Sequence, residues 1–160
     1  MPDNTAVRGA RLHNLKNLSN VPIPEAFVAA LLSGGAAHAV AARPISRDLG
    51  ALRAGGLALL LLGLGLIAWA MAAARNIRID RPTALVTLGP YALSRNPMYV
   101  GWALCSLAVS LLVNSRWLLV TTSAAGLYHH LHEIPKEEEF LLAHFGEEYE
   151  SYRRRTRRYL

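Results

Sequence analysis

Cysteine and charged residues are both scarce in this sequence. Cys105 is the only cysteine, which excludes a disulfide framework and a metal site built from cysteines. Charged residues make up 18% of the chain against 52% hydrophobic residues, and the mean hydropathy is +0.22. That balance lies outside the range of ordinary soluble domains and indicates a membrane protein.

One segment has no charge at all, since residues 55–74 read GGLALLLLGLGLIAWAMAAA. Such a run is long enough to cross a bilayer core of about 30 Å, so we expect it to span a membrane. Three further apolar stretches lie at about 26–42, 98–113 and 117–131. Only a short polar break at 114–116 separates the last two, which predicts a helical hairpin that turns at a membrane surface.

The N-terminal part of the chain lacks the features of a signal peptide. Residues 1–24 are polar and have no apolar core ahead of a small-residue cleavage site. We expect residues 1–20 to form a polar, disordered tail and residues 21–160 to form one membrane domain. The predicted fold class is all-α, a polytopic membrane protein with about four transmembrane helices and a cytosolic C-terminal helical segment.

Basic residues are distributed unevenly over this topology. All but four of the 17 lysines and arginines lie on the side that carries both termini, the exceptions being Arg43, Arg47, Arg53 and Arg116. Because cytoplasmic loops are enriched in Lys and Arg, we expect an integral membrane protein with both termini in the cytoplasm. A cysteine placed at Ser115 in the 114–116 turn would then be labelled by an impermeant reagent from outside the cell. The net charge of +6 is assigned to orientation and to anionic lipid headgroups, not to nucleic-acid binding.

Two segments on the predicted cytoplasmic side carry residues that are unusual for a membrane edge. The first is GPYALSRNPMYVG, at 89–101, and the second is IPKEEEFLLAHFGEEYESYRRRTRRYL, from Ile134 onward. In the second, Pro135 predicts a helix interruption, and an amphipathic stretch follows that breaks near Gly146. The arginines at 153–158 are interpreted as a device for topology and for contact with lipid headgroups.

In order and spacing, these two segments resemble the isoprenylcysteine carboxyl methyltransferase family, which is related to phospholipid methyltransferases. The shared pattern is a G-P-Y turn, R-N-P-x-Y-x-G, a pair of glutamates, and F-G-x-x-Y-x-x-Y with trailing arginines. The resemblance runs from about Val21 to Leu160, and the segment VPIPEAFVAALLSGGAAHAV at 21–40 looks like the bacterial branch of the family, which implies a bacterial inner membrane. It implies a membrane enzyme that binds S-adenosylmethionine from the cytosol and methylates a lipophilic acceptor, either the carboxylate of an isoprenylcysteine-like molecule or another lipid-like molecule.

The resemblance also implies roles for residues of the two motifs. Glu137 and Glu138 would hold the ammonium and hydroxyl groups of the cofactor, and Arg95 would hold a carboxylate bidentately. Arg95 and Glu138 are the predicted catalytic residues. Glycines would allow close backbone approach, and tyrosines would offer ring faces and hydroxyls. The other predicted cofactor-binding residues are Gly89, Pro90, Tyr91, Asn96, Pro97, Tyr99 and Gly101.

Each of these residues has a plainer interpretation. Tyr91 and Tyr99 also suit an interfacial aromatic belt, and Arg95 also suits a lipid phosphate. Asn96 stands where many relatives have histidine, which argues against a mechanism that needs an imidazole there. The rival functions are a membrane reductase of the steroid-reductase type that uses NADPH, and a non-catalytic membrane protein.

Two further patterns are interpreted structurally. GLGLIA at 63–68 matches a dinucleotide glycine pattern but lies inside an apolar segment, so its small residues are expected to let helices pack closely. His129 and His132 share one helical face, but the sequence shows no third ligand, so no metal site is predicted and an interfacial role is favoured. Methyl transfer to a carboxylate needs no base, whereas an amine or thiol acceptor would need one, with Glu138 as the nearest candidate.

Overall fold

The computed structural model describes residues 24–75 and 84–159, and this part of the chain is built from helices and short loops. It contains no β-sheet, so the predicted all-α class is confirmed for the described residues, whereas the predicted tail at 1–20 lies outside them. In chain order the elements are α2 (Glu25–Val40), α3 (Leu49–Ala74), the 3₁₀ turn η2 (Gly89–Ala92), α4 (Pro97–Leu112), α5 (Arg116–Tyr128), the π-helical turn η3 (His129–Glu133), α6 (Ile134–Phe145) and α7 (Glu147–Arg155).

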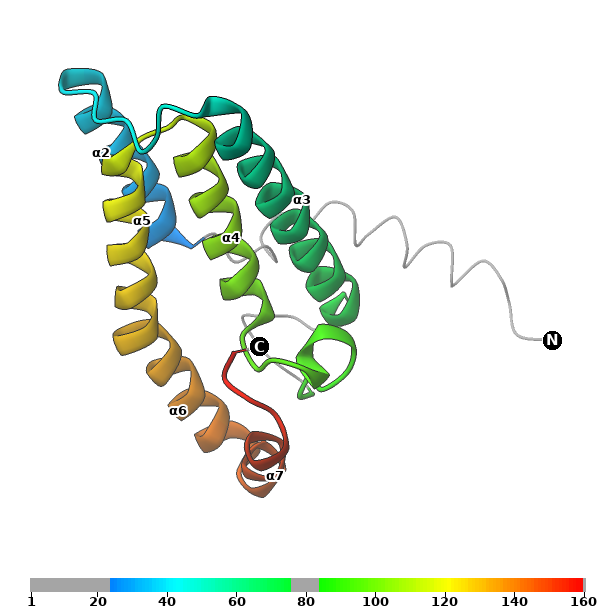
Figure 1. The fold of residues 1–160 in the computed structure, drawn as a ribbon. Helices are drawn as coiled ribbons and strands as arrows, with labels where there is room; N and C mark the ends of the chain where they lie inside the picture. The colour runs from blue at the N-terminus through cyan, green and yellow to red at the C-terminus, as the bar shows by residue number, and fades with distance from the viewer. Residues whose placement is uncertain (1–23, 76–83, 160) are drawn as a thin grey trace, which may run out of the picture.

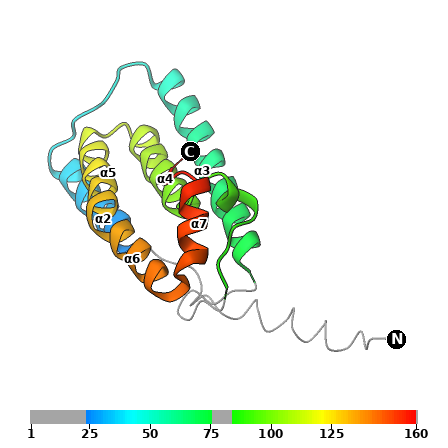
Figure 2. The same ribbon diagram turned by 90° about the horizontal axis from the view of Figure 1, so that it is seen from below.

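Four long helices run alongside one another (Figures 1 and 2). Helix α3 packs mainly on α4, and α2 packs mainly on α5, while α4 and α5 form the hairpin between these two outer helices. Helices α6 and α7 extend beyond one end of this bundle, and the described C-terminal residues return to that same end (Figure 1). The two sequence motifs therefore meet at one end of the molecule.

The surface of α3 distributes its residues as a lipid-facing helix does. Small residues such as Gly56, Gly63 and Ala70 are buried, the two glycines against α4, whereas large ones such as Leu61 and Leu62 are exposed. Small residues allow close helix contact in a bilayer, where lipid can cover the exposed leucines. Within the described residues, α3 is the one helix that is long and apolar enough to cross a membrane, and α2 and α4 are shorter, at 16 residues each. The prediction of four spans therefore stays a prediction.

The predicted helical hairpin is confirmed, and its turn is fixed by specific bonds. Asn114 adopts a positive φ of 57°, and its side-chain oxygen accepts hydrogen bonds from the backbone N–H groups of Ile45 and Ser46, at 2.8 and 3.0 Å. Ser115 is buried and caps α5 by accepting from the Leu118 N–H at 3.2 Å. Because Ser115 is buried, its exposed neighbour Arg116 is the better position for the labelling test of orientation.

The prediction that Pro135 interrupts the helix is wrong. The chain stays helical from α5 through η3 into α6, and Pro135 lies in the first turn of α6. Proline lacks an N–H group and its ring clashes with the carbonyl four residues earlier. The π turn just before Pro135 is wider than an α-helical turn, because its hydrogen bonds join residues five positions apart instead of four. The wider turn accommodates both the missing N–H group and the proline ring. The predicted break at Gly146 is confirmed, since Gly146 separates α6 from α7 with a φ of 52°.

Candidate functional site

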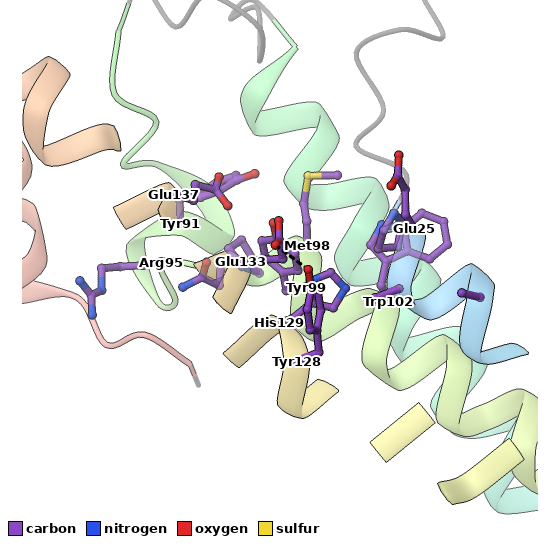
Figure 3. A pocket seen from close by; sticks show the side chains of 15 residues that line it. Glu25, Tyr91, Arg95, Met98, Tyr99, Trp102, Tyr128, His129, Glu133 and Glu137 are labelled. Carbon is purple, nitrogen blue, oxygen red and sulfur yellow. Dashed lines mark hydrogen bonds between the residues drawn. The ribbon is translucent and has the colours of Figure 1, made fainter. Parts of the chain in front are cut away.

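A cavity of about 710 Å³ opens at the end of the bundle where the two motifs meet. This volume lies within the range of small-molecule sites in proteins. Its walls come from the start of α2, the loop before α4, the first turns of α4, the end of α5, η3 and the first turn of α6. The lining residues are Pro24, Glu25, Ala26, Ala29, Tyr91, Arg95, Asn96, Pro97, Met98, Tyr99, Trp102, Tyr128, His129, Glu133 and Glu137. Figure 3 shows these side chains from close by.

Acidic and aromatic side chains dominate this lining. Three carboxylates (Glu25, Glu133 and Glu137) and one guanidinium, that of Arg95, are among the lining groups. The aromatic side chains are those of Tyr91, Tyr99, Trp102 and Tyr128, together with the imidazole of His129. Aromatic faces and carboxylates both attract cations. The cavity is therefore suited to a ligand that is flat and carries positive charge.

Glu137 and Tyr99 come together across the cavity, although 38 positions separate them in the sequence. Solvent reaches the Glu137 side chain, yet protein groups surround its carboxyl closely enough that desolvation raises its pKa. A hydrogen-bonding interaction with the Tyr99 hydroxyl opposes this shift, while the negative charges of Glu138 and Glu133 add to it. A bound cation would favour the ionised form of this carboxyl.

The charge of Glu137 also acts on a second tyrosine. Burial, and then the nearby Glu137 carboxylate, raise the pKa of Tyr91 to about 12, so its phenol is neutral near pH 7. Glu133 behaves in the opposite way, because hydrogen bonds from Lys136 and Tyr128 lower its pKa. The cavity thus combines one carboxylate that is firmly ionised with one that is costly to ionise.

The first motif forms a tight turn against α3. Gly89 has a φ of 62°, a conformation that glycine adopts without strain. A Cβ atom there would lie 3.2 Å from the Trp69 indole nitrogen and 3.2 Å from the Ala73 Cβ. Pro90 is buried in this turn, and Pro97 opens α4 at a position where proline is well tolerated. Close packing on α3 thus places the loop that carries Tyr91, Arg95 and Asn96.

The C-terminal segment docks on this loop through its backbone. The Arg95 N–H donates to the Arg157 carbonyl at 2.8 Å, within an isolated bridge that pairs Ser94 with Arg157. The Ser94 hydroxyl and the Asn96 amide both donate to the Arg158 carbonyl, each at 3.2 Å. The Tyr152 hydroxyl donates to the Tyr91 carbonyl at 2.7 Å. The last residues described therefore form part of the support of the site.

A shared carboxylate completes this support. Glu138 accepts two hydrogen bonds from the Arg158 guanidinium, at 3.1 and 2.6 Å, and pairs with Arg95 at 3.2 Å. In Figure 3 the Arg95 side chain extends away from Tyr99 and His129, in the direction of the C-terminal segment. The interpretation of the arginine run as a headgroup device is thus wrong for Arg158, whose guanidinium joins α6 to the C-terminal end.

Comparison with known proteins identifies the chain. The phospholipid methyltransferase family matches residues 52–148, which is more than half of the sequence. The chain belongs to this family. It is also 37% identical over 83 residues to the protein-S-isoprenylcysteine O-methyltransferase of Xenopus laevis. That alignment covers 51% of this chain and 28% of the relative, so the chain spans little more than a quarter of the relative's length.

The family predicted from the two motifs is therefore confirmed, and the structure places the predicted site residues in two groups. The residues that line the cavity are Tyr91, Arg95, Asn96, Pro97, Tyr99 and Glu137. Gly89, Pro90, Gly101 and Glu138 do not line it. A Cβ atom at Gly101 would meet Ile67 and Gly63 on α3, so the structure gives this glycine a role in helix packing, and its place beside the cofactor stays a prediction. The cofactor-binding roles of the other predicted site residues also stay predictions.

Several lining residues of this phospholipid methyltransferase family member were not predicted as site residues. Among them are Met98, which lies within the first motif, Trp102, which lies one turn further along α4, and Glu133, which precedes the glutamate pair by one helical turn. The signal that could have found them is helical periodicity extended from the motifs. His129 was weighed as half of a metal pair and then assigned an interfacial role, and the described residues contain no cluster of three metal-ligating side chains.

Proposed function

We propose that this phospholipid methyltransferase family member transfers a methyl group from S-adenosylmethionine to a lipophilic acceptor where the membrane meets the cytosol. The observation that carries the proposal is the acidic, aromatic cavity of about 710 Å³ at the end of the bundle where the two motifs meet. S-adenosylmethionine has a sulfonium, an ammonium and a flat adenine, and carboxylates and aromatic faces are the groups that bind these. The Xenopus relative, by its name, methylates the oxygen of an isoprenylcysteine, and we propose a carboxylate of that kind as the acceptor group.

For this reaction the protein must mainly bind the two reactants and orient them. Bound S-adenosylmethionine would supply an electrophilic methyl group. A carboxylate oxygen forms a bond to that methyl carbon as the carbon–sulfur bond breaks, and the bonding electron pair stays on sulfur. No proton moves, and two opposite charges disappear. The residues around the cavity would therefore align the two reactants and keep water out.

A second cavity, of about 330 Å³, supports a lipophilic acceptor. It lies along α4 and α5 and is lined mostly by apolar side chains, among them Val100, Leu104 and Leu107. Tyr99 and His129 line both cavities, so the two spaces meet at these side chains. We propose that the apolar chain of the acceptor occupies this second cavity, with its reactive end at the junction.

The rival function, a reductase that uses a nicotinamide cofactor, has no support in the family match. The acidic lining argues against it as well, because the pyrophosphate of such a cofactor carries negative charge. Titration of the detergent-purified protein with S-adenosylhomocysteine and with NADPH separates the two functions. Binding of NADPH with no binding of S-adenosylhomocysteine would overturn the proposal.

The first prediction concerns Glu137. We expect Glu137→Gln to weaken S-adenosylmethionine binding about tenfold to a hundredfold, because a charge-assisted hydrogen bond contributes about 1.5–3 kcal/mol. Isothermal titration calorimetry with the purified protein measures this change. Glu147→Gln on α7 is the matched control, since Glu147 is exposed and does not line the cavity. Equal weakening by both substitutions would mean that only the overall acidity of this surface matters.

The raised pKa of Glu137 predicts how S-adenosylmethionine binding depends on pH. Its pKa in the free protein is raised, and a bound cation favours its ionised form, so binding should release a proton near that pKa. Affinity for S-adenosylmethionine should therefore rise with pH above the ordinary range of a glutamate and level off once Glu137 is ionised. In Glu137→Gln this part of the pH dependence should be absent. Its persistence in the variant would assign it to another group.

The next prediction concerns the second cavity. Gly126 on α5 lines this space, and a Cβ atom there would meet nothing within 4 Å. We expect Gly126→Leu to fold normally and to raise the KM for a long-chain acceptor at least tenfold, while S-adenosylhomocysteine binding stays unchanged. Gly65→Leu on α3 is the control, because Gly65 has equal free space but lies outside both cavities. An unchanged KM in Gly126→Leu would exclude this cavity as the place of the chain.

A further inference from the structure

His129 occupies an unusual position among the buried side chains. It is 6% exposed, and neither ring nitrogen has a hydrogen-bond partner among the described residues. Its ring stacks on Phe27 with centroids 4.9 Å apart and lies 5.0 Å from the ring of Tyr99. Buried polar groups without partners are rare and costly, so a position that keeps one calls for an explanation.

The backbone gives a second and independent reason to look at His129. It is the first residue of η3, and single π turns within α-helices occur frequently at functional sites. Pro135 accounts for the turn, but the turn also decides what faces the cavity, since His129 and Glu133 both line it. Glu133 is satisfied by Tyr128 and Lys136 at 3.1 and 3.2 Å, whereas His129 is left without a partner.

The location of His129 indicates which ligand would supply the missing partner. It lines both the acidic cavity and the apolar cavity, so it lies where the reactive end of an acceptor would meet the methyl donor (Figure 3). An imidazole N–H donates well to a carboxylate. The nearby carboxylates of Glu133 and Glu137 leave few other groups at this junction that could hold an anion.

We propose that His129 binds the carboxylate of the acceptor, with one ring N–H donating to the oxygen that does not receive the methyl group. This rests on the proposed function. The other carboxylate oxygen is then free to form the bond to the methyl carbon as the carbon–sulfur bond breaks, and His129 neither gains nor loses a proton. Because the hydrogen bond is made to the charged acceptor and weakens as that charge disappears, it aids binding and orientation more than the chemical step.

The test compares His129→Phe with His129→Asn and His129→Gln in a methyl-transfer assay with N-acetyl-S-farnesylcysteine. Phenylalanine keeps the ring that packs on Phe27 but removes both nitrogens. We expect it to raise the KM for this acceptor about tenfold to a hundredfold, with kcat within about threefold of wild type and S-adenosylhomocysteine affinity unchanged. One of the two amide variants, which keep an N–H donor, should restore most of the loss. His132→Phe is the matched control, because His132 is exposed and lines neither cavity.

Three results would overturn this role. A fall in kcat at unchanged KM would make His129 a participant in the chemical step, and equal defects in the Phe, Asn and Gln variants would make it a packing residue. The third is an equal effect of His129→Phe on the affinity for N-acetyl-S-farnesylcysteine and for its methyl ester, measured by equilibrium dialysis, since the ester lacks the charged oxygen. Failure of the proposed function looks different, because the wild-type protein would then not bind S-adenosylhomocysteine at all.

Discussion

Glu138→Gln is expected to lower the free energy of unfolding by about 3–5 kcal/mol, the usual cost of removing one partner from a buried ion pair. The Glu138 and Arg95 side chains are only 12% and 11% exposed, and Glu138 also holds Arg158. Without this carboxylate, the Arg95 guanidinium stays buried with no opposite charge, and its Nε and Nη1 atoms already lack partners. The C-terminal segment loses its side-chain attachment to α6 at the same time.

The measurement is the thermal unfolding midpoint of detergent-purified protein. Glu148→Gln on α7 is the control, because Glu148 is exposed and no ion pair holds it among the described residues. Arg158→Ala should cost less than Glu138→Gln, since Glu138 would still pair with Arg95. The double variant should cost less than the sum of the two single changes, because both remove the same bonds. A Glu138→Gln protein as stable as wild type would show that solvent replaces the carboxylate.

This result also bears on the predicted roles of Arg95 and Glu138. The resemblance implied that both act on the cofactor, whereas the structure joins them to each other and to Arg158. Asn96 and Tyr91 on the same loop are bonded to the C-terminal segment. We therefore expect loss of Glu138 to weaken S-adenosylhomocysteine binding through displacement of this loop. The Arg158 side chain bonds to Glu138, which in turn pairs with the cavity residue Arg95, so Arg158→Ala should weaken binding in the same direction.

Helix positions were largely predictable from the sequence because they follow from local chemistry. Proline is favoured in the first turn, so Pro97 predicts the start of α4, and glycine ends helices, so Gly146 predicts the break after α6. The short polar break predicts the hairpin. The continuation of the helix through Pro135 was not predictable in the same way. A proline usually ends a helix, and the sequence alone does not show that a π turn will let the helix continue through it.

Within the candidate site, only residues that belong to the two motifs were predicted from the sequence. The motifs named Tyr91, Asn96, Tyr99 and Glu137, and the fold brings these to one cavity. The docking of the C-terminal segment was not foreseen, because its bonds go to the backbone carbonyls of Arg157 and Arg158. Backbone groups are present in every residue, so the sequence carries no mark of such contacts. The sequence of an arginine run also does not show whether its side chains are solvated or form ion pairs.

Glycines were the least predictable residues of the site, since one residue type serves both close ligand approach and close helix packing. For Gly63 the packing interpretation is confirmed, because a Cβ atom there would lie 2.8 Å from the Gly101 carbonyl. Gly101 faces Gly63 in return, with a Cβ position 2.6 Å from Ile67 and 3.1 Å from the Gly63 carbonyl. The two glycines thus let α3 and α4 come into backbone contact.

Gly101→Val is therefore expected to separate α3 from α4 and to destabilise the protein by at least about 1–3 kcal/mol, the typical cost of overpacking. The neighbours of the new side chain include a backbone carbonyl, which cannot move aside as a flexible side chain can. The thermal unfolding midpoint should fall, and S-adenosylhomocysteine binding should fall only as far as folding is lost. Gly65→Val is the matched control, since it adds the same side chain to the open face of α3. A Gly101→Val protein of wild-type stability that no longer binds S-adenosylhomocysteine would restore this glycine to the cofactor site.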